Sequence, residues 1–175
     1  RPDQINGRPV LTLERSSIKA TEGERVALPR CVVDDHEAAA FAQTVHVVLH
    51  ALNADARFLV VDTEGVEVLD EDNVLRLTGT PALLTEALER VSVAYPAEWC
   101  GADVVTYAAT DGEGLRARNA TVAVSLEAAN DAPFVTLEAS DATASVGDAV
   151  VVEATFSDND ANGYNTAKII DKVNK

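Results

Sequence analysis

Aromatic side chains are scarce in this sequence. Phe, Trp and Tyr account for 5% of its 175 residues, whereas hydrophobic residues account for 47%. A core of this composition consists of Val, Leu and Ala, and the β-branched side chain of Val suits a pleated sheet. The composition therefore favours strands over helices.

Positive charge is also scarce. The chain has 14 Lys and Arg against 29 Asp and Glu, which gives a net charge of −15 at pH 7. Such a surface repels nucleic acids and anionic membranes, so we expect neither as a partner. Cations are the natural counterpart, although an acidic surface can also serve only to keep a repeat protein soluble.

Long apolar runs are missing as well. A membrane span needs about 20 consecutive apolar residues, so the sequence predicts no insertion into a bilayer. No signal peptide precedes Arg1, and we expect the chain to be cut from a longer one. The triplet Asn119-Ala120-Thr121 is an acceptor sequence for N-glycosylation beside a predicted turn, although such triplets also arise by chance. Asn119 is therefore a candidate glycosylation site and indicates secretion.

Enzyme motifs are not found either. The chain has no nucleophile elbow, phosphate-binding loop or HExxH-type spacing. We therefore expect that the protein is not an enzyme.

Cysteine occurs only twice. A secreted chain tends to pair its cysteines, which makes Cys31 and Cys100 a candidate disulfide. The predicted strands place the two at opposite ends, because about eight residues at about 3.3 Å each separate them by roughly 26 Å. A disulfide needs Cα atoms within about 6 Å. The pairing stays open at this point.

The chain repeats itself after 124 residues. Pro9–Asp35 and Pro133–Asn159 align without a gap and are identical at 9 of 27 positions. Internal repeats of this kind are the signature of module arrays. The sequence therefore predicts a complete module over residues 1–131, followed over residues 132–175 by the N-terminal part of a second, truncated one.

Alternation of polar and apolar residues predicts about seven or eight strands in the first module. Their ranges are Pro9–Arg15, Arg25–Val33, Thr44–Leu49, Arg57–Asp62, Val74–Thr78, Val91–Tyr95, Val104–Thr110 and Ala117–Glu127. Ala82–Arg90 is predicted as a short amphipathic helix with Pro81 in its first turn. The acidic segment Thr63–Asn73 is predicted as a loop, and Ala38–Phe41 could start a helix. This order predicts an all-β fold, a Greek-key β-sandwich with one short crossover helix.

Several segments resemble the cadherin-like tandem repeats of large extracellular adhesins and matrix proteins. They are Leu77–Leu84, Tyr95-Pro96, Trp99–Asp103, Tyr107–Gly114 and Asn130–Pro133. The resemblance covers nearly the whole first module. It implies an Ig/cadherin-like sandwich, a structural or adhesive role at the cell surface, and neighbouring repeats as partners. Homophilic contacts or other cell-surface proteins are further partners that it implies.

The resemblance also implies calcium as a cofactor. Cadherin repeats bind this ion between modules through an Asn-Asp-x-Pro linker and an Asp-x-Asp after the second strand. The residues that match or lie in the corresponding loops are Glu22, Asn130, Asp131, Asp158, Asp160, Asp34 and Asp111. Gly7 and His36 depart from the pattern at the N-terminal end, and Val146 replaces the equivalent of Glu22 in the second module.

Strand direction supports the same grouping without the family. If strands alternate, the loops after Val33 and Thr110 meet near the N-terminus, whereas those at Glu22 and before Asp103 meet near Asn130. Oxygen atoms from three separated segments suit a hard cation with six to eight ligands at about 2.3–2.6 Å. The alternative is that these residues are polar caps, and for Asp111 we expect a role in capping its glycine-rich turn.

Two other functions remain open. The first is a calcium-independent Ig-like spacer or filament module, whose acidic residues serve solubility only. The second is a carbohydrate-binding module that uses Trp99 and the nearby loops, although a core position for this side chain is the simpler interpretation.

Overall fold

The structure is a computed structural model that describes residues 7–130, 132, 134–137, 145–147, 149–157 and 165–172. The chain divides into two compact units, Arg1–Ala128 and Ala129–Lys175. The division follows Ala128, whereas the repeat in the sequence suggested residue 131. Among the described residues, no helix has the length and apolar character that crossing a bilayer requires.

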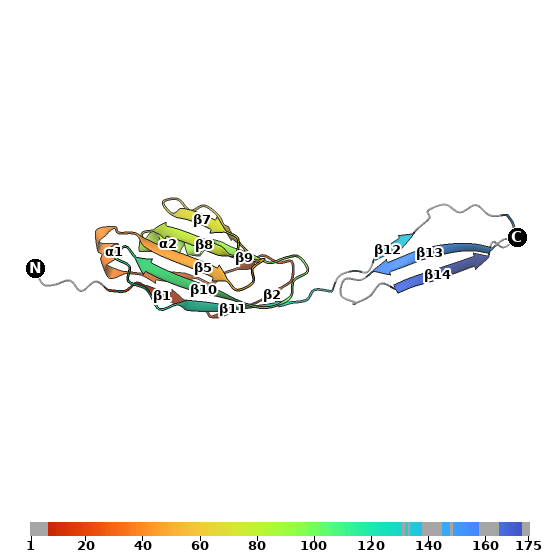
Figure 1. Cartoon of the computed structure of the whole chain (residues 1–175), viewed down its shortest axis with the longest axis horizontal. Helices are drawn as coiled ribbons and strands as arrows, with labels where there is room; N and C mark the ends of the chain where they lie inside the picture. Colours follow the sequence, from red (N-terminus) through yellow and green to blue (C-terminus); the bar gives the residue numbers. More distant parts are fainter. Residues whose placement is uncertain are drawn as a thin grey trace, which may run out of the picture. The chain divides into compact units, whose positions relative to one another are not determined.

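Unit 1 is an all-β sandwich with two short helices, α1 (His36–Phe41) and α2 (Pro81–Leu88) (Figure 1). Its strands are β1 (Val10–Leu13), β2 (Ser17–Thr21), β3 (Val26–Ala27), β4 (Cys31–Asp34), β5 (Val45–Ala51), β6 (Arg57–Val60), β7 (Glu67–Glu71), β8 (Val74–Gly79), β9 (Val91–Ala94), β10 (Gly101–Asp111) and β11 (Ala120–Glu127). One layer is a six-stranded sheet in the order β2-β11-β10-β5-β8-β7. The other layer holds the sheet β3-β9-β6 and the pair β1-β4.

The core forms where the inward faces of these sheets meet. In β5, Val45, Val47 and Leu49 are fully buried, whereas the alternating His46 and His50 are exposed. The same period of two runs through β8, β9 and β10. Val, Leu and Ala make up most of the buried cluster, as the composition predicted.

The prediction of a strand over Pro9–Arg15 is confirmed by β1, but the strand that follows it was not predicted. β1 pairs antiparallel with β4 in one layer, and β2 then crosses to the other layer and pairs parallel with β11. The crossing stays hydrogen-bonded, because the Glu14 N–H donates to the Arg30 carbonyl at 2.9 Å and the Ala123 N–H donates to the Ser16 carbonyl at 2.8 Å. One segment therefore ties both layers together.

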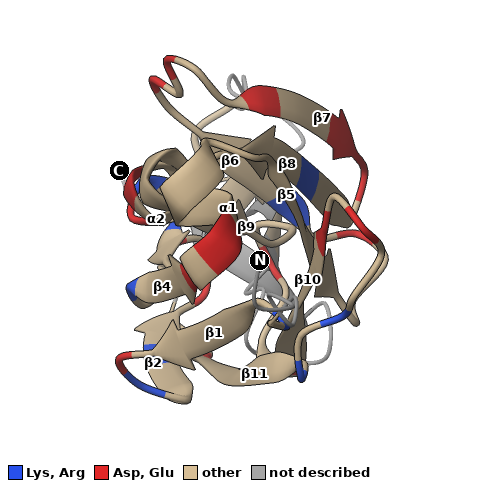
Figure 2. Ribbon diagram, turned by 90° about the vertical axis from the view of Figure 1, so that its left-hand side faces the viewer, with Lys and Arg blue, Asp and Glu red and all other residues tan. Residues whose placement is uncertain are grey.

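The prediction of a loop over Thr63–Asn73 was wrong, because this segment contains the edge strand β7. It pairs antiparallel with β8, from Glu67 opposite Thr78 to Glu71 opposite Val74. Figure 2 shows acidic residues towards both ends of β7. Acidic side chains on an edge strand discourage pairing with other chains. Because these side chains are polar, the segment lacks the alternation of apolar residues by which a strand is predicted from sequence.

The predicted fold has one helix, whereas unit 1 has two, and the additional helix is α1. It begins at Asp35, whose Oδ1 accepts hydrogen bonds from the N–H groups of Glu37 and Ala38 at 3.1 and 2.9 Å. It ends at Ala42, which has a left-handed φ of 51°. Helix α2 lies within the predicted range but ends at Leu88, because Glu89 is its C-cap.

The turn between β10 and β11 depends on a buried aspartate. Asp111 is 6% exposed, and its Oδ1 accepts hydrogen bonds from the N–H groups of Glu113 at 3.0 Å and Leu115 at 2.7 Å. Gly114 supplies a positive φ of 91°. The side chain of Asp111 therefore caps this turn.

A second buried aspartate lies at the other end of β10. Asp103 is 3% exposed, and its Oδ1 accepts from the Asn53 N–H and its Oδ2 from the Tyr95 hydroxyl, both at 2.9 Å. Burial, together with the hydrogen bond to Asp103 and its charge, raises the pKa of Tyr95. The Tyr95 ring stacks on Trp99 with centroids 4.7 Å apart.

Unit 2 contains a three-stranded antiparallel sheet in the order β12-β13-β14. Its strands are β12 (Phe134–Leu137), β13 (Ala149–Ser157) and β14 (Asn165–Lys172). The sequence predicted the first two, over Phe134–Glu138 and Val150–Phe156. The polar start of β14 left that strand unpredicted.

The candidate disulfide is not formed, since Cys31 and Cys100 are both free. Cys31 is fully buried in β4, whereas Cys100 is exposed just before β10. The reason is their separation along the strands. Cys31 belongs to the strand that leads to α1, and Cys100 adjoins Gly101, which pairs with Leu126 at the end where β11 finishes.

We predict that iodoacetamide at pH 8 modifies only Cys100 in the native protein. Cys31 has no exposed surface, and burial raises the pKa of its thiol to about 11, so little thiolate is present. Intact-mass spectrometry should show one adduct in buffer and two in urea. Cys100→Ser should remove the native adduct. Two adducts under native conditions would contradict the burial, and none in urea without reductant would indicate a disulfide.

We also predict that Asp111→Ala lowers the free energy of unfolding by about 1–3 kcal/mol, because two backbone N–H groups lose a carboxylate acceptor. Asp111→Asn keeps an oxygen at the same place and should cost less. Urea unfolding followed through the fluorescence of Trp99, the single tryptophan, gives both values. Equal losses in the two variants would mean that the negative charge matters more than the cap.

Candidate functional site

The predicted metal ligands fall into three groups. Asp34 and Asp111 lie at the N-terminal end of unit 1, Glu22 lies at its C-terminal end, and Asn130 belongs to unit 2. Asp131, Asp158 and Asp160 lie outside the described residues. The predicted convergence of Glu22 with the linker and the Asp-x-Asp therefore stays a prediction.

Glu22 is placed at the C-terminal end by the turn between β2 and β3. Its N–H donates to the carbonyl of Glu127 at 2.9 Å, so it lies beside the last residue of β11. Gly23, at φ 75°, turns the chain, and the Glu24 carboxylate accepts the Thr21 N–H at 3.0 Å. Asn130 follows Glu127 by only three residues in the sequence. A carboxylate thus lies next to the strand that leads to the linker.

The N-terminal end uses its carboxylates to bind backbone N–H groups. Asp35 caps α1, Asp111 caps its turn, and Glu37 Oε2 accepts the Gly7 N–H at 2.6 Å. Asp34 is exposed, and its backbone pairs with Val10. At this end the acidic side chains therefore have structural roles that compete with a cation.

Asp35 is a residue that the sequence reasoning passed over. Asp35 stands two residues before Glu37 and the three alanines that follow it, which is a helix N-cap signal that could have identified it. It is 4% exposed, and its Oδ2 is buried with no hydrogen-bond partner in the described part of the chain. A buried carboxylate oxygen in that position is costly. Asp34, which the sequence favoured, is the more exposed of the two neighbours.

Within the ranges that the structure describes, no three side chains of His, Cys, Asp or Glu are grouped closely enough to hold a metal ion. Unit 1 alone therefore does not provide a closed carboxylate cage from its described residues. A calcium site of the predicted kind needs oxygen atoms from the linker and from the second module, as the resemblance implied.

The other two predicted features lie on the surface of unit 1. Asn119 is exposed immediately before β11, so its side chain amide is accessible to a glycan. Trp99 is half-buried, packs against the core and is stacked on Tyr95, which covers one face of the indole. A sugar would have only the remaining exposed part of the ring to bind.

No protein-family model matches the chain, and no curated protein matches it. The solved structures similar to it include the titin domains Z1Z2 in complex with telethonin, with 15% sequence identity and a TM-score of 0.36. That match covers 88% of this chain and 65% of the titin chain. A chimeric titin Z1Z2 functionalised with a peptide from decorin has 14% identity, a TM-score of 0.32 and the same coverage.

An endo-fucoidan hydrolase of glycoside hydrolase family 107 has 11% identity and a TM-score of 0.31. That match covers 97% of this chain and 29% of the hydrolase. The chain thus spans less than two thirds of each of these structures. Likenesses this distant indicate no function.

Proposed function

We propose that the chain is a structural or adhesive part of an array of cadherin-like modules in a large extracellular or cell-surface protein. The observation that carries this proposal is the internal repeat, in which Pro133–Asn159 restarts the sequence of Pro9–Asp35. The expected partners are the neighbouring repeats, with homophilic contacts or other cell-surface proteins beyond them. The proposal includes no catalytic role.

The path of the chain through unit 1 supports an array. β1 starts with Val10 opposite Asp34, at the end that holds α1 and the Asp111 turn. β11 finishes with Glu127 opposite Thr21, at the other end, and Figure 1 shows the chain leaving there. A module with its two termini at opposite ends can be joined in series without long linkers.

Calcium at the junction is the second part of the proposal. Glu22 lies beside Glu127 and brings a carboxylate next to the strand that precedes Asn130 and Asp131. Without the ion, these carboxylates and those of Asp158 and Asp160 would repel one another and leave the junction flexible. Calcium cancels this charge and binds oxygen atoms of both modules, which fixes the angle between them.

A calcium-independent spacer is the alternative that a specific observation favours. Glu24, Asp35 and Asp111 all accept backbone N–H groups in loops or at a helix start. Acidic loop residues in this chain therefore have a structural purpose without any ion. The carbohydrate-binding alternative receives less support, because Tyr95 covers one face of Trp99.

We predict that calcium raises the melting temperature of the chain. An ion that binds only the folded junction stabilises it by RT ln(1 + [Ca²⁺]/Kd), or about 2.7 kcal/mol at a hundredfold excess over Kd. Magnesium should stabilise less, because it demands octahedral geometry and gives up its waters reluctantly. Calorimetric melts in calcium, magnesium and chelator at constant ionic strength measure the difference.

Asp131→Asn should remove most of the calcium effect. Asp70→Asn, on the exposed edge strand β7, is the matched control because it removes the same charge away from the junction. If the protein melts at one temperature in all three conditions, the calcium-independent spacer is the correct account. If both variants lose the effect equally, calcium acts by general screening of the acidic surface.

A further inference from the structure

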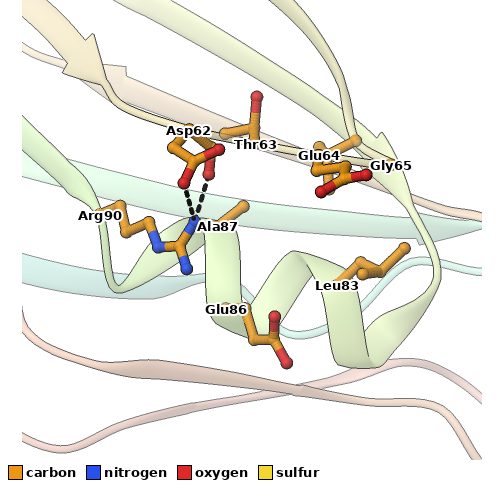
Figure 3. A pocket seen from close by; sticks show the side chains of 9 residues that line it. Asp62, Thr63, Glu64, Gly65, Leu83, Glu86, Ala87 and Arg90 are labelled. Atoms are coloured by element: carbon orange, nitrogen blue, oxygen red, sulfur yellow. Dashed lines mark hydrogen bonds and ion pairs between the residues drawn. The ribbon is translucent and has the colours of Figure 1, made fainter.

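Unit 1 has a pocket that none of the predicted sites uses. It lies between the loop after β6 and helix α2 and has a volume of about 420 Å³ (Figure 3). Pockets that bind small molecules have volumes of about 300–1,000 Å³. Its lining consists of Asp62, Thr63, Glu64, Gly65, Val66, Leu83, Glu86, Ala87 and Arg90.

The loop side of the pocket is held in a defined conformation. Asp62 has a left-handed φ of 53°, which is uncommon for a residue with a side chain. Arg90 fixes it, since its Nη1 donates to the Asp62 carbonyl and lies 3.4 Å from Asp62 Oδ2. Gly65 has a φ of 78°, and a Cβ at this position would lie 3.0 Å from Leu83 Cδ1. Another residue at this position would be strained by the positive φ and would displace the Leu83 side chain, so glycine is favoured here.

The floor of the pocket is apolar and its rim is polar. Val66 and Leu83 are half-buried and Ala87 is buried, so methyl and methylene groups line the floor. Figure 3 shows the Glu86 side chain on the helix side and the Glu64 side chain on the loop side. A ligand with an aliphatic stem and a polar tip matches this arrangement.

The charge of the pocket lining determines which polar group of a ligand fits. The lining has three carboxylates, on Asp62, Glu64 and Glu86, and one guanidinium, on Arg90, which leaves a net charge of 1 − 3 = −2. Arg90 is already paired with Asp62. Among the described residues, neither Glu64 nor Glu86 forms an ion pair. The chain as a whole carries −15, so an anionic ligand would be repelled from this pocket.

We propose that this pocket binds the side chain of a lysine or arginine presented by another polypeptide. The aliphatic stem lies along Leu83 and Ala87, and the terminal cation lies between the carboxylates of Glu64 and Glu86. Long basic side chains commonly bury their stems on apolar surface while the charge stays near water. The lining contains none of the predicted calcium ligands, so the proposal is independent of calcium and of the array.

The acidic edge strand β7 is a useful comparison, because it has carboxylates but does not line the pocket. It carries Glu67, Asp70 and Glu71, which give it as many carboxylates as the pocket. Figure 2 shows red segments towards both ends of β7. Neither the pocket beside α2 nor the pocket lined by Ala42, Gln43, Thr44, Gly112 and Glu113 includes these three residues.

The test is a titration of the ¹⁵N-labelled chain with the peptide Gly-Gly-Lys-Gly-Gly at constant ionic strength, followed by amide chemical shifts. We expect saturable shifts in residues 62–66 and 83–90. Acetylation of the lysine, which removes the charge and keeps the stem, should weaken binding at least tenfold. The variant Glu64→Gln/Glu86→Gln should weaken it at least fivefold.

The matched control is Glu14→Gln/Glu98→Gln, which removes the same charge from two exposed sites outside the pocket. It should stay within twofold of the unsubstituted chain. These surface changes leave the core intact, and the shift pattern of each variant checks its fold. Shifts spread over all acidic surfaces, or an equal effect of both double variants, would overturn the proposal. Binding that is unaffected by acetylation would do the same.

Discussion

The structure of unit 1 depends on two buried aspartates at the ends of one strand. β10 pairs with β5 on one side and β11 on the other, so its position sets both neighbours. Asp103 and Asp111 point inward from its two ends, and each accepts two hydrogen bonds from neighbouring loops. Burying a carboxylate costs free energy, and hydrogen bonds to its oxygen atoms offset that cost. The core therefore fixes these loops through charge rather than through apolar contacts.

Because buried aspartates hold loops in place, the excess of acidic residues cannot be interpreted only as surface charge. The carboxylates of Asp35 and Glu24 also accept backbone N–H groups, at the start of α1 and at the turn after β2. Such residues hold loops in place in addition to contributing negative charge. The remaining acidic residues divide into exposed edges such as β7, the pocket beside α2 and the region of the linker. Net charge alone could not separate these roles.

Much of the fold followed from the sequence, because alternation and turn residues report burial directly. The hairpin of β10 and β11, the helix after Pro81 and the repeat were all visible in it. The edge strand β7 was missed because its polar side chains face solvent. The division of Arg25–Val33 into β3 and β4, which belong to two different sheets, was missed because both halves are extended and differ only in long-range pairing. The pocket depends on the positive φ of Asp62 and on Gly65, which periodicity cannot reveal.

The two ends of unit 1 differ in how their acidic residues are used, and the two linker sequences differ correspondingly. Where the later linker has Asp131, the earlier one has Gly7, whose N–H donates to Glu37. At the same end, the carboxylates of Asp35 and Asp111 accept hydrogen bonds from backbone N–H groups, so a cation there would have to compete with these N–H groups. At the other end, Glu22 is positioned through its main chain, by the hydrogen bond to Glu127. This anchor places Glu22 beside the last residue of β11, three residues before Asn130, which is why the proposed ion is assigned to the C-terminal end.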